Sequence, residues 1–318
     1  MLFDSAMLAR ICADLQEVLS GCRVRRVVAT GKLEVAVETS AQGGAPWLVV
    51  CAGSEFGRVH LAQDAEPRPD IHSPLADVMR RYLQGAVIRR IEQISFDRLL
   101  HIEFINAQRL GPQARCELVA EVMGRHSNIL LLDEDGVILE CLKHISAEVN
   151  RYRQSLPGIE YVAPPDFGNV NPFTVSAEQF SQAARQADEQ AFSDWFRANF
   201  HGGSSIFIAE VAAALGTHPD IELRALPEGW PVRLAQTLAH LQEMFGQSGE
   251  AYICRDPRSD ELFAYPFVPR SRPDLVTTPA ASLSGSLEQV HRELGDRHRF
   301  RQLREQLLRR RASGWMGF

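Results

Sequence analysis

The chain has 318 residues, of which 45% are hydrophobic and 23% charged, so it is long enough for two or three domains with a sizeable core. Its formal net charge of −6 excludes a uniformly basic nucleic-acid binder, although local clusters of arginine occur. No apolar run approaches the roughly 20 residues of a membrane span, and no signal peptide is visible, which predicts a cytoplasmic protein without a membrane partner.

Cysteine and lysine usage further restrict the class of protein. The cysteines are scattered, without a C-x-x-C pair, at Cys12, Cys22, Cys51, Cys116, Cys141 and Cys254. This pattern predicts buried, reduced thiols, and we expect no metal site and no cofactor. Arginine supplies nearly all of the positive charge, because Lys32 and Lys143 are the only lysines. The planar guanidinium group suits phosphate recognition.

The first 165 residues predict an α+β domain with an antiparallel meander of strands. A helix is expected from Asp4 to Leu19, with Asp4 as a candidate N-cap, and a second from Ser73 to Leu83, where Pro74 occupies the first helical position. Hydrophobic patterning predicts strands at 24–30, 33–38, 47–51, 58–62, 87–95, 98–105, 116–123, 128–132 and 137–145.

The second half of the chain is mainly helical. Residues 174–216 form helices in this interpretation, with Phe180, Trp195, Phe196 and Phe200 as bulky anchors and a Gly-rich turn at 201–205. A helix at 232–245 precedes a hairpin, 251–254 and 261–267, that could join the first domain's sheet. After a loop at 282–286, an Arg-rich helix from 287 to about 311 has the narrow apolar stripe typical of a coiled coil. It ends soon after it starts, which indicates a truncated chain or a lost arm.

Two polar turns are the candidate binding site. One holds Asp97 and Arg98, and the other is the run Arg125, His126, Ser127 and Asn128, which follows Glu121 and Gly124. Hairpin corners are often polar simply because solvent reaches them. Donor-rich clusters at the ends of rigid strands can nevertheless bind ligands.

Each candidate also has an ordinary structural interpretation. Asp4 can be an N-cap, and Asp97–Arg98 a surface ion pair. The run from Arg125 to Asn128 can be turn chemistry, with His126 a structural histidine. Glu121 can hold Arg98 or Arg125 in place. The arginine pairs at 80–81 and 89–90 are best interpreted as solvated faces, and Gly202-Gly203 as a steric requirement of a turn.

Several motifs together resemble the N-terminal region of the NFACT family, which includes bacterial RqcH and eukaryotic NEMF. The most specific is Met123-Gly124-Arg125-His126-Ser127-Asn128, and the others are Phe3-Asp4, 21–24, 79–86, Asp97-Arg98, 156–161 and Pro164-Pro165. The resemblance implies an antiparallel β-sandwich domain at 1–168, like the N-terminal domain of formamidopyrimidine-DNA glycosylases. It further implies a helix-hairpin-helix-like module at 172–228, a helix and hairpin returning to the first domain at 229–282, and the start of a coiled coil at 287–313.

The resemblance also implies a function. Members of this family bind obstructed large ribosomal subunits and their rRNA, and recruit tRNA, alanyl-tRNA in bacteria, for C-terminal tailing of stalled chains. In the family, positions matching Asp4, Asp97 and Arg98 are associated with tRNA recruitment. We add Glu121, Arg125, His126, Ser127 and Asn128 as candidate tRNA-binding residues.

Two other functions stay open at this point. An older family name, fibronectin-binding protein A, implies a surface adhesin, and the glycosylase-like fold implies a DNA-binding enzyme. The chain begins Met1-Leu2-Phe3 and lacks the N-terminal proline nucleophile and four-cysteine zinc finger of those enzymes. No Ser-His-Asp motif, phosphate-binding glycine loop or metal-ligand spacing is visible, so we expect no catalysis.

Overall fold

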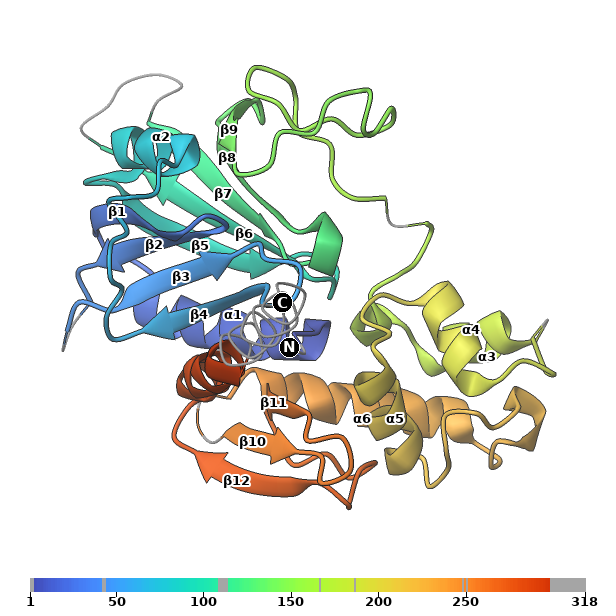
Figure 1. Ribbon diagram of the computed structural model, residues 1–318. Coiled ribbons are helices and arrows are strands. Elements are labelled where there is room, and N and C mark those ends of the chain that lie inside the picture. The colour runs from blue at the N-terminus through green and yellow to red at the C-terminus, as the bar shows by residue number, and fades with distance from the viewer. Residues whose placement is uncertain are drawn as a thin grey trace, which may run out of the picture.

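Two antiparallel sheets form the N-terminal half of the protein in a computed structural model, which describes residues 3–41, 44–107, 114–165, 167–185, 187–247, 249 and 251–297. The four-stranded sheet has the order β1 (Val24–Gly31), β2 (Glu34–Thr39), β3 (Trp47–Cys51) and β4 (Arg58–Ala62). The five-stranded sheet has the order β5 (Val87–Gln93), β6 (Leu99–Ile105), β7 (Arg115–Glu121), β8 (Asn128–Asp133) and β9 (Ile138–Cys141). Figure 1 shows them as two layers.

The core lies between these layers and explains the strand pattern. Leu48 and Val50 from β3 are buried in the same cluster as Leu100, Ile102 and Phe104 from β6. Alternate residues of β6 therefore face the core, as expected for one side of a sandwich. The predicted antiparallel arrangement is confirmed, although β9 is shorter than the expected 137–145.

Two helices close the open sides of the sandwich. Helix α1 (Ser5–Leu19), capped by Asp4, packs against β4 and β5, one strand from each sheet. Helix α2 (Pro74–Leu83), capped by Ser73, packs against β1 on one sheet and β8 and β9 on the other. Both helices and both caps match the sequence prediction, because cap chemistry and apolar periodicity are local signals.

A helical module follows the sandwich. It contains η3 (Pro172–Thr174), α3 (Ala177–Ala184), α4 (Phe192–Asn199), α5 (Ser205–Ala214), η4 (Leu223–Ala225) and α6 (Trp230–Phe245). The predicted anchors Phe180, Trp195, Phe196 and Phe200 are buried, and their cluster is continuous with the sandwich core. The two parts are therefore packed together through shared apolar contacts, not joined by an exposed linker alone.

The C-terminal hairpin forms a third sheet. Strands β10 (Ala251–Arg255) and β11 (Leu262–Tyr265) pair with β12 (Val276–Ala280) in the order β11-β10-β12. The prediction that this hairpin could join the first domain's sheet is therefore wrong. The backbone N–H of Leu61 on β4 instead donates to Ser284 Oγ at 3.0 Å, so the last helix covers that edge. The sequence did not predict strand β12, because this strand is polar and contains Pro279. Proline argues against a strand unless the strand lies at the edge of a sheet, as β12 does.

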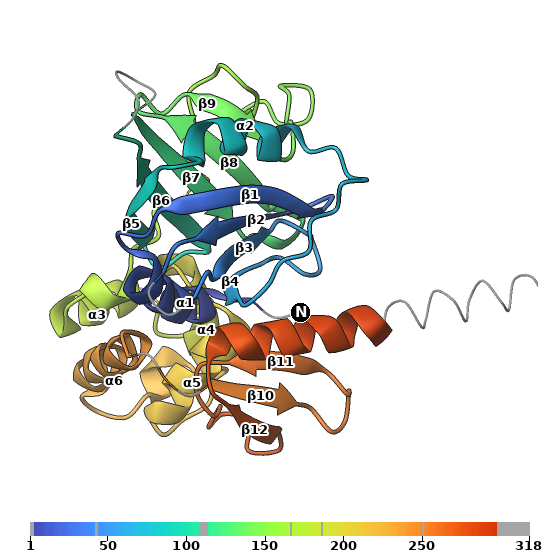
Figure 2. The same cartoon turned by 90° about the vertical axis from the view of Figure 1, so that its left-hand side faces the viewer.

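The last helix starts earlier than expected. Helical structure begins at residue 283, inside the predicted loop, and is described to residue 297. Leu283, Leu287 and Val290 are buried in the main core, and Figure 2 shows this helix lying between β4 and the third sheet. The coiled coil predicted at 287–313 overlaps this helix as far as residue 297 and otherwise lies outside the described residues. It stays a prediction, as do the helix-hairpin-helix likeness and the domain boundaries. Within the described part of the chain, every helix is too short or too polar to cross a bilayer.

Candidate functional site

The two polar turns singled out in the sequence are neighbours. Asp97 and Arg98 occupy the turn between β5 and β6, and η2 (Gly124–His126) occupies the turn between β7 and β8. Because β6 pairs with β7, Leu99 lies opposite Glu121, and the N–H of Val122 donates to the carbonyl of Arg98 at 2.9 Å. The expected juxtaposition of these turns at one sheet end is confirmed.

The backbone before Asp97 is strained and anchored by a buried ring. Ser95 and Phe96 have φ angles of 51° and 59°, a region that bulky residues rarely occupy. The Phe96 ring extends into the helical module, with its centroid 4.5 Å from that of Phe173 and 5.1 Å from that of Phe207. Burial of this ring stabilises the turn and fixes Asp97 and Arg98 against the module.

The Gly-rich turn of the module meets the same ring. Gly202 has a φ of 76°, and a Cβ there would lie 2.2 Å from a ring carbon of Phe96. Glycine is therefore required both by conformation and by the close approach. This contact places Gly203 and His201 beside the Asp97 turn, and Nδ1 of His201 lies 4.0 Å from Oδ2 of Asp97.

Two adjoining cavities lie where the sandwich meets the module. The small cavity, of about 350 Å³, and the large cavity, of about 900 Å³, share Asp97, Arg98, Gly202 and Gly203 as lining residues. We call the two together the cleft. Gly124 also lines the small cavity, so both predicted polar turns and the Gly-rich turn contribute to one site.

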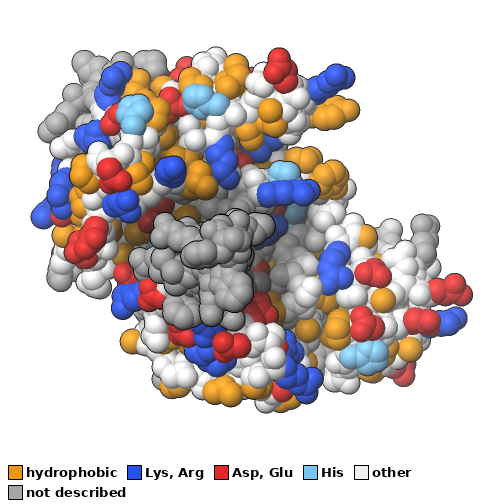
Figure 3. Space-filling model, viewed as in Figure 1, with side chains coloured by type: hydrophobic (Ala, Val, Ile, Leu, Met, Phe, Trp, Pro, Cys, Tyr) orange, Lys and Arg blue, Asp and Glu red, His pale blue; other side chains and the backbone are white. Residues whose placement is uncertain are grey.

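Arg98 presents its guanidinium to this cleft. This group makes no hydrogen bond or ion pair with any residue that the structure describes, so the structural alternative of a surface ion pair does not hold for Arg98. Oδ1 of Asp97 instead accepts the backbone N–H of Arg98 at 2.7 Å. Further cationic or histidine side chains line the large cavity, namely Arg153, Arg197, His126 and His201. Figure 3 shows arginine and histidine side chains at the edge of the hollow between sandwich and module.

Asp4 is buried and joins three parts of the fold. Its Oδ1 accepts the N–H of Met7 at 3.0 Å as the N-cap of α1, and its Oδ2 accepts from Ser204 Oγ at 2.7 Å and from the Tyr265 hydroxyl at 3.4 Å. Desolvation raises the pKa of Asp4, although these hydrogen bonds and nearby Arg98 oppose the rise. The carboxyl group lines the small cavity but is committed to the ends of α1, α5 and β11.

The raised pKa of Asp4 predicts a pH dependence of stability. The folded protein holds this proton more tightly than the unfolded chain, so the group contributes stability that is fully present below the ordinary pKa of 3.8 and is lost as pH rises through the folded pKa. Asp4→Asn cannot ionise, and we expect its unfolding free energy to decline less with pH and to equal or exceed wild type at neutral pH. Urea unfolding between about pH 4 and 8 measures this difference.

Asp4→Ala is the matched control for that experiment. It removes the cap as well as the charge, and it should be about 1 kcal/mol less stable than Asp4→Asn at every pH, because neither variant can ionise. A decline with pH in Asp4→Asn as steep as in wild type would contradict the account of a proton held by burial.

Glu121 has a different partner from the one expected. Glu121 is 1% exposed at the end of β7 and forms a bidentate ion pair with Arg153. It does not pair with Arg98 or Arg125, the two expected partners. The Tyr161 hydroxyl donates to Glu121 Oε1 at 2.9 Å, and burial, with the adjacent carboxylate, raises the pKa of Tyr161. The carboxylate lines neither cavity, so we assign it no direct contact with a ligand.

Ser127 and Asn128 are also buried, and the Asn128 side chain and the Ser127 carbonyl hold the turn. The Asn128 side chain donates to the carbonyl of Lys143 at 2.9 Å and accepts the N–H groups of Ile129 and Lys143. Lys143 Nζ donates to the carbonyls of Ser127 and Ala52 and so ties the turn to the end of β3. The expectation of direct contact is corrected for both residues, because ligands cannot reach 1% exposed side chains.

Arg125 and His126 are exposed members of the same turn. Arg125 Nε donates to His126 Nε2 at 2.9 Å, and His126 lines the large cavity. Of the predicted residues, Asp97, Arg98, Arg125 and His126 are therefore accessible on or beside the cleft. The others lie beneath the surface and support it.

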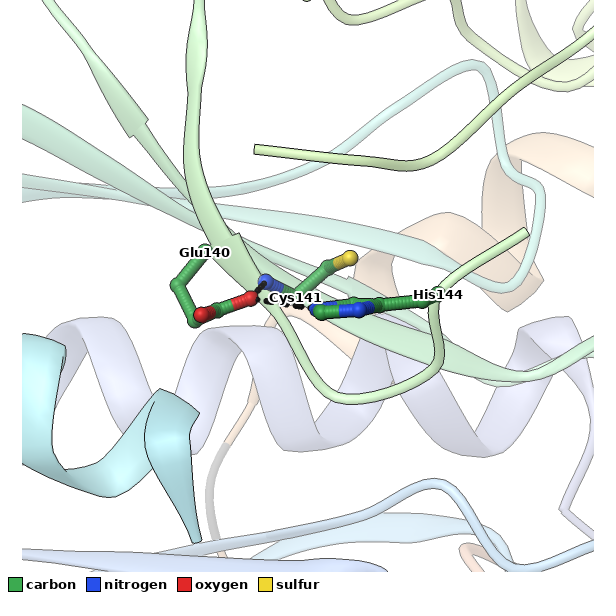
Figure 4. Close-up of side chains that lie close together, drawn as sticks. All are labelled: Glu140, Cys141 and His144. Carbon is green, nitrogen blue, oxygen red and sulfur yellow. Dashed lines mark hydrogen bonds and ion pairs between the residues drawn. The ribbon is translucent and has the colours of Figure 1, made fainter. Parts of the chain in front are cut away.

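One cluster has the residue types of a metal site. Glu140, Cys141 and His144 bring ligand atoms within 4.8 Å of one another (Figure 4). Cys141 Sγ donates to the carbonyls of Lys143 at 3.4 Å and Ser155 at 3.3 Å, while Glu140 Oε1 accepts from Cys141 N–H and His144 Nε2. Burial, then the neighbouring carboxylates, raise the pKa of Cys141 to about 12, so the thiolate ligand is scarce at neutral pH. These contacts fit a hydrogen-bonded structural cluster.

Two aromatic residues that line the large cavity, Tyr152 and Phe167, were not predicted as site residues. Tyr152 is 96% exposed and Phe167 is 88% exposed, yet both lie in an irregular segment without hydrophobic periodicity. Exposed aromatic rings beside arginines are typical of surfaces that stack nucleobases. Tyr152 and Phe167 lie on either side of Leu156-Pro157-Gly158 in the sequence, and no motif or periodicity there indicated that they are exposed.

Comparison with known proteins decides the family. A family model described as the NFACT N-terminal and middle domains matches residues 4–314. The chain belongs to the NFACT family. The predicted membership is confirmed over nearly the whole chain, including the helical module and the third sheet.

Individual NFACT relatives agree with this membership. The chain is 28% identical over 311 residues to the Rqc2 homolog RqcH of Streptococcus pneumoniae serotype 2, covering 98% of this chain and 51% of the relative. It is 35% identical over 180 residues to the Rqc2 homolog RqcH of Streptococcus suis, covering 56% of this chain and 33% of the relative. The chain thus spans at most about half the length of these relatives.

A solved structure supports the fold. The N-terminal part of the fibronectin/fibrinogen-binding protein from Streptococcus suis superposes with a TM-score of 0.70 at 24% identity, covering 92% of this chain and all of that chain. At this identity the likeness concerns the fold alone, and it extends across the sandwich, the module and the third sheet.

Proposed function

We propose that this chain is the RNA-binding N-terminal part of a ribosome-associated quality-control factor that recruits tRNA to obstructed large ribosomal subunits for C-terminal tailing of stalled chains. The observation that carries the proposal is the uncommitted guanidinium of Arg98 in a cleft between two packed modules. Membership in the NFACT family and similarity to proteins named RqcH support it.

The chemistry of the cleft suits folded RNA. Arg98 offers a planar fork to a phosphate or a base edge, and further cationic groups line the same cavity. Asp97 would repel phosphate, but its carboxylate can accept from a base amino group or a ribose hydroxyl. Tyr152 and Phe167 present aromatic faces on which unpaired bases can stack. A duplex alone would leave these rings unused.

The proposal assigns binding and positioning, not bond formation, to this chain. Holding tRNA in a productive orientation on the subunit lowers the entropic cost of the tailing reaction, while peptide transfer stays with the ribosome. No catalytic residue or cofactor is invoked. We expect the partners to be alanyl-tRNA and the large subunit with its rRNA, and the location to be cytoplasmic.

Sequencing of RNA that co-purifies with the full-length native protein tests the proposal. We expect tRNA, with alanine acceptors foremost, and 23S-type rRNA to be enriched over a mock purification. Co-purification should weaken as salt rises, because phosphate contacts release counterions. Recovery of RNA in the same proportions as the mock sample would overturn the proposal.

A surface adhesin is the second candidate, because the solved S. suis relative carries the name fibronectin/fibrinogen-binding protein. Saturable binding of fibronectin to the folded chain, together with display on intact cells, would support it. Location of the native protein entirely inside cells would remove it. These outcomes are independent of the RNA experiment.

A further inference from the structure

One wall of the large cavity is a long segment without regular structure. Between β9 and η3, from Leu142 to Asn171, the described residues form turns and isolated bridges but no helix or ladder strand. Such long irregular loops in compact domains are uncommon and are often functional. Five of the ten large hydrophobic side chains found exposed in the described part of the chain lie here, at Val149, Tyr152, Val162, Phe167 and Val170. Ile159 and Tyr161 pack against a small apolar cluster of the five-stranded sheet, so the rest of the segment needs polar contacts to hold it.

A cluster of one buried and two half-buried side chains supplies that hold. Arg153, on the segment, pairs bidentately with Glu121 at the end of β7 and also donates to the carbonyl of Val162 at 2.5 Å. Tyr161, further along the segment, donates to the same carboxylate at 2.9 Å, and the guanidinium of Arg153 lies 5.5 Å from its ring centroid. We call Glu121, Arg153 and Tyr161 the clamp.

The clamp joins both halves of the segment to the five-stranded sheet. Glu121 pairs in register with Leu99 of β6 and Asn128 of β8, so its position follows the five-stranded sheet. A buried ion pair contributes little net stability because desolvation opposes the attraction. Its directional hydrogen bonds, however, fix the orientation of the groups that it joins. Apolar residues of similar volume would not specify one loop conformation in this way.

The clamp is adjacent to the exposed ring of the cleft. Tyr152 precedes Arg153, and the backbone N–H groups of both donate to Asn150 Oδ1, at 3.0 and 3.1 Å. Asn150, Tyr152 and Arg153 all line the large cavity. Locking the Arg153 side chain therefore sets the direction in which Tyr152 projects, although Glu121 itself is out of reach of any ligand.

We infer that Glu121, Arg153 and Tyr161 are positioning residues that preform the RNA-facing wall and act through Tyr152. This inference rests on the proposed function, since it assigns the wall to tRNA. Preformed contact surfaces bind more tightly because less conformational entropy is lost on binding. Loss of Glu121 or of the Tyr161 hydroxyl should therefore weaken tRNA affinity without removing a side chain that lines the cleft.

A double-mutant cycle on the full chain tests the inference, with tRNA affinity measured by filter binding. Glu121→Gln should weaken binding about fivefold, the effect of roughly one hydrogen bond. Tyr152→Ala should weaken it about tenfold, as for one lost stacked base. The double variant should match Tyr152→Ala alone, because the clamp acts through that ring. Glu117→Gln, on the same strand but paired with His101, is the matched control and should bind like wild type.

Each outcome of the cycle has a defined meaning. Losses that multiply in the double variant, or wild-type affinity of folded Glu121→Gln, would overturn the inference. Tyr161→Phe removes one hydrogen bond and leaves the ion pair, so it replaces Glu121→Gln if that variant fails to fold. In both clamp variants, limited proteolysis should cut faster within 146–165, and in Tyr161→Phe, which keeps the ion pair, the unfolding transition should change little. If Arg98→Ala also binds like wild type, the proposed function fails, not the clamp alone.

Discussion

Replacing both Asp97 and Arg98 with alanine is expected to abolish detectable tRNA binding while leaving the unfolding transition close to that of wild type. The Arg98 guanidinium makes no hydrogen bond or ion pair with the described residues, so its removal breaks neither kind of contact. A charge-assisted hydrogen bond to RNA contributes about 1.5–3 kcal/mol, and Arg98 alone should therefore account for a loss of roughly ten- to a hundredfold.

Filter binding or gel shift with purified tRNA, paired with thermal unfolding, measures this effect. Arg89→Ala is the matched control, since Arg89 is an exposed arginine on β5 outside the cleft. The control should retain wild-type affinity, which separates a site effect from the loss of overall positive charge. Unchanged affinity of the double variant would count decisively against the cleft as the tRNA site.

Phe96→Ala should destabilise the protein by about 3–5 kcal/mol, the usual cost of emptying a buried phenylalanine site. The Phe96 ring joins the β5–β6 turn to three phenylalanines of the helical module, Phe173, Phe207 and Phe245. Its loss also frees the strained turn that carries Asp97 and Arg98. We therefore expect both stability and tRNA affinity to fall.

Denaturant unfolding and tRNA binding under conditions where the variant is folded distinguish these two effects. Phe104→Ala is the control, because Phe104 is equally buried but lies inside the sandwich core, away from the module. It should lose similar stability and keep its tRNA affinity once folded. Full affinity in folded Phe96→Ala would show that the walls of the cleft do not depend on this ring.

Local patterning predicted most of the first domain. The caps Asp4 and Ser73, the two helices and the order of the strands follow from residues close together in the sequence. The adjacency of the Asp97 turn and η2 also followed, since consecutive antiparallel strands bring alternate turns to one end. The half-buried position of Arg98 on the cleft is consistent with the role that the resemblance implied.

Contacts between distant segments could not be predicted in the same way. Glu121 pairs with Arg153 across 32 residues, in a segment whose path no periodicity specifies. Strand β12, which pairs with the hairpin, is a polar edge strand without a hydrophobic pattern. The last helix starts early because Leu283 is buried in the main core, which the local sequence does not indicate. Tyr152 and Phe167 became visible as candidates only when their exposure was known.

Crosslinking of bound tRNA to the native protein, followed by mapping of the modified peptides, tests the central claim most directly. The account predicts crosslinks in the segments that line the cleft, at 97–98, 123–126, 150–153 and 164–165 and at Phe167. Crosslinks confined to the exposed arginines of β1 and β5, with none in these segments, would contradict it.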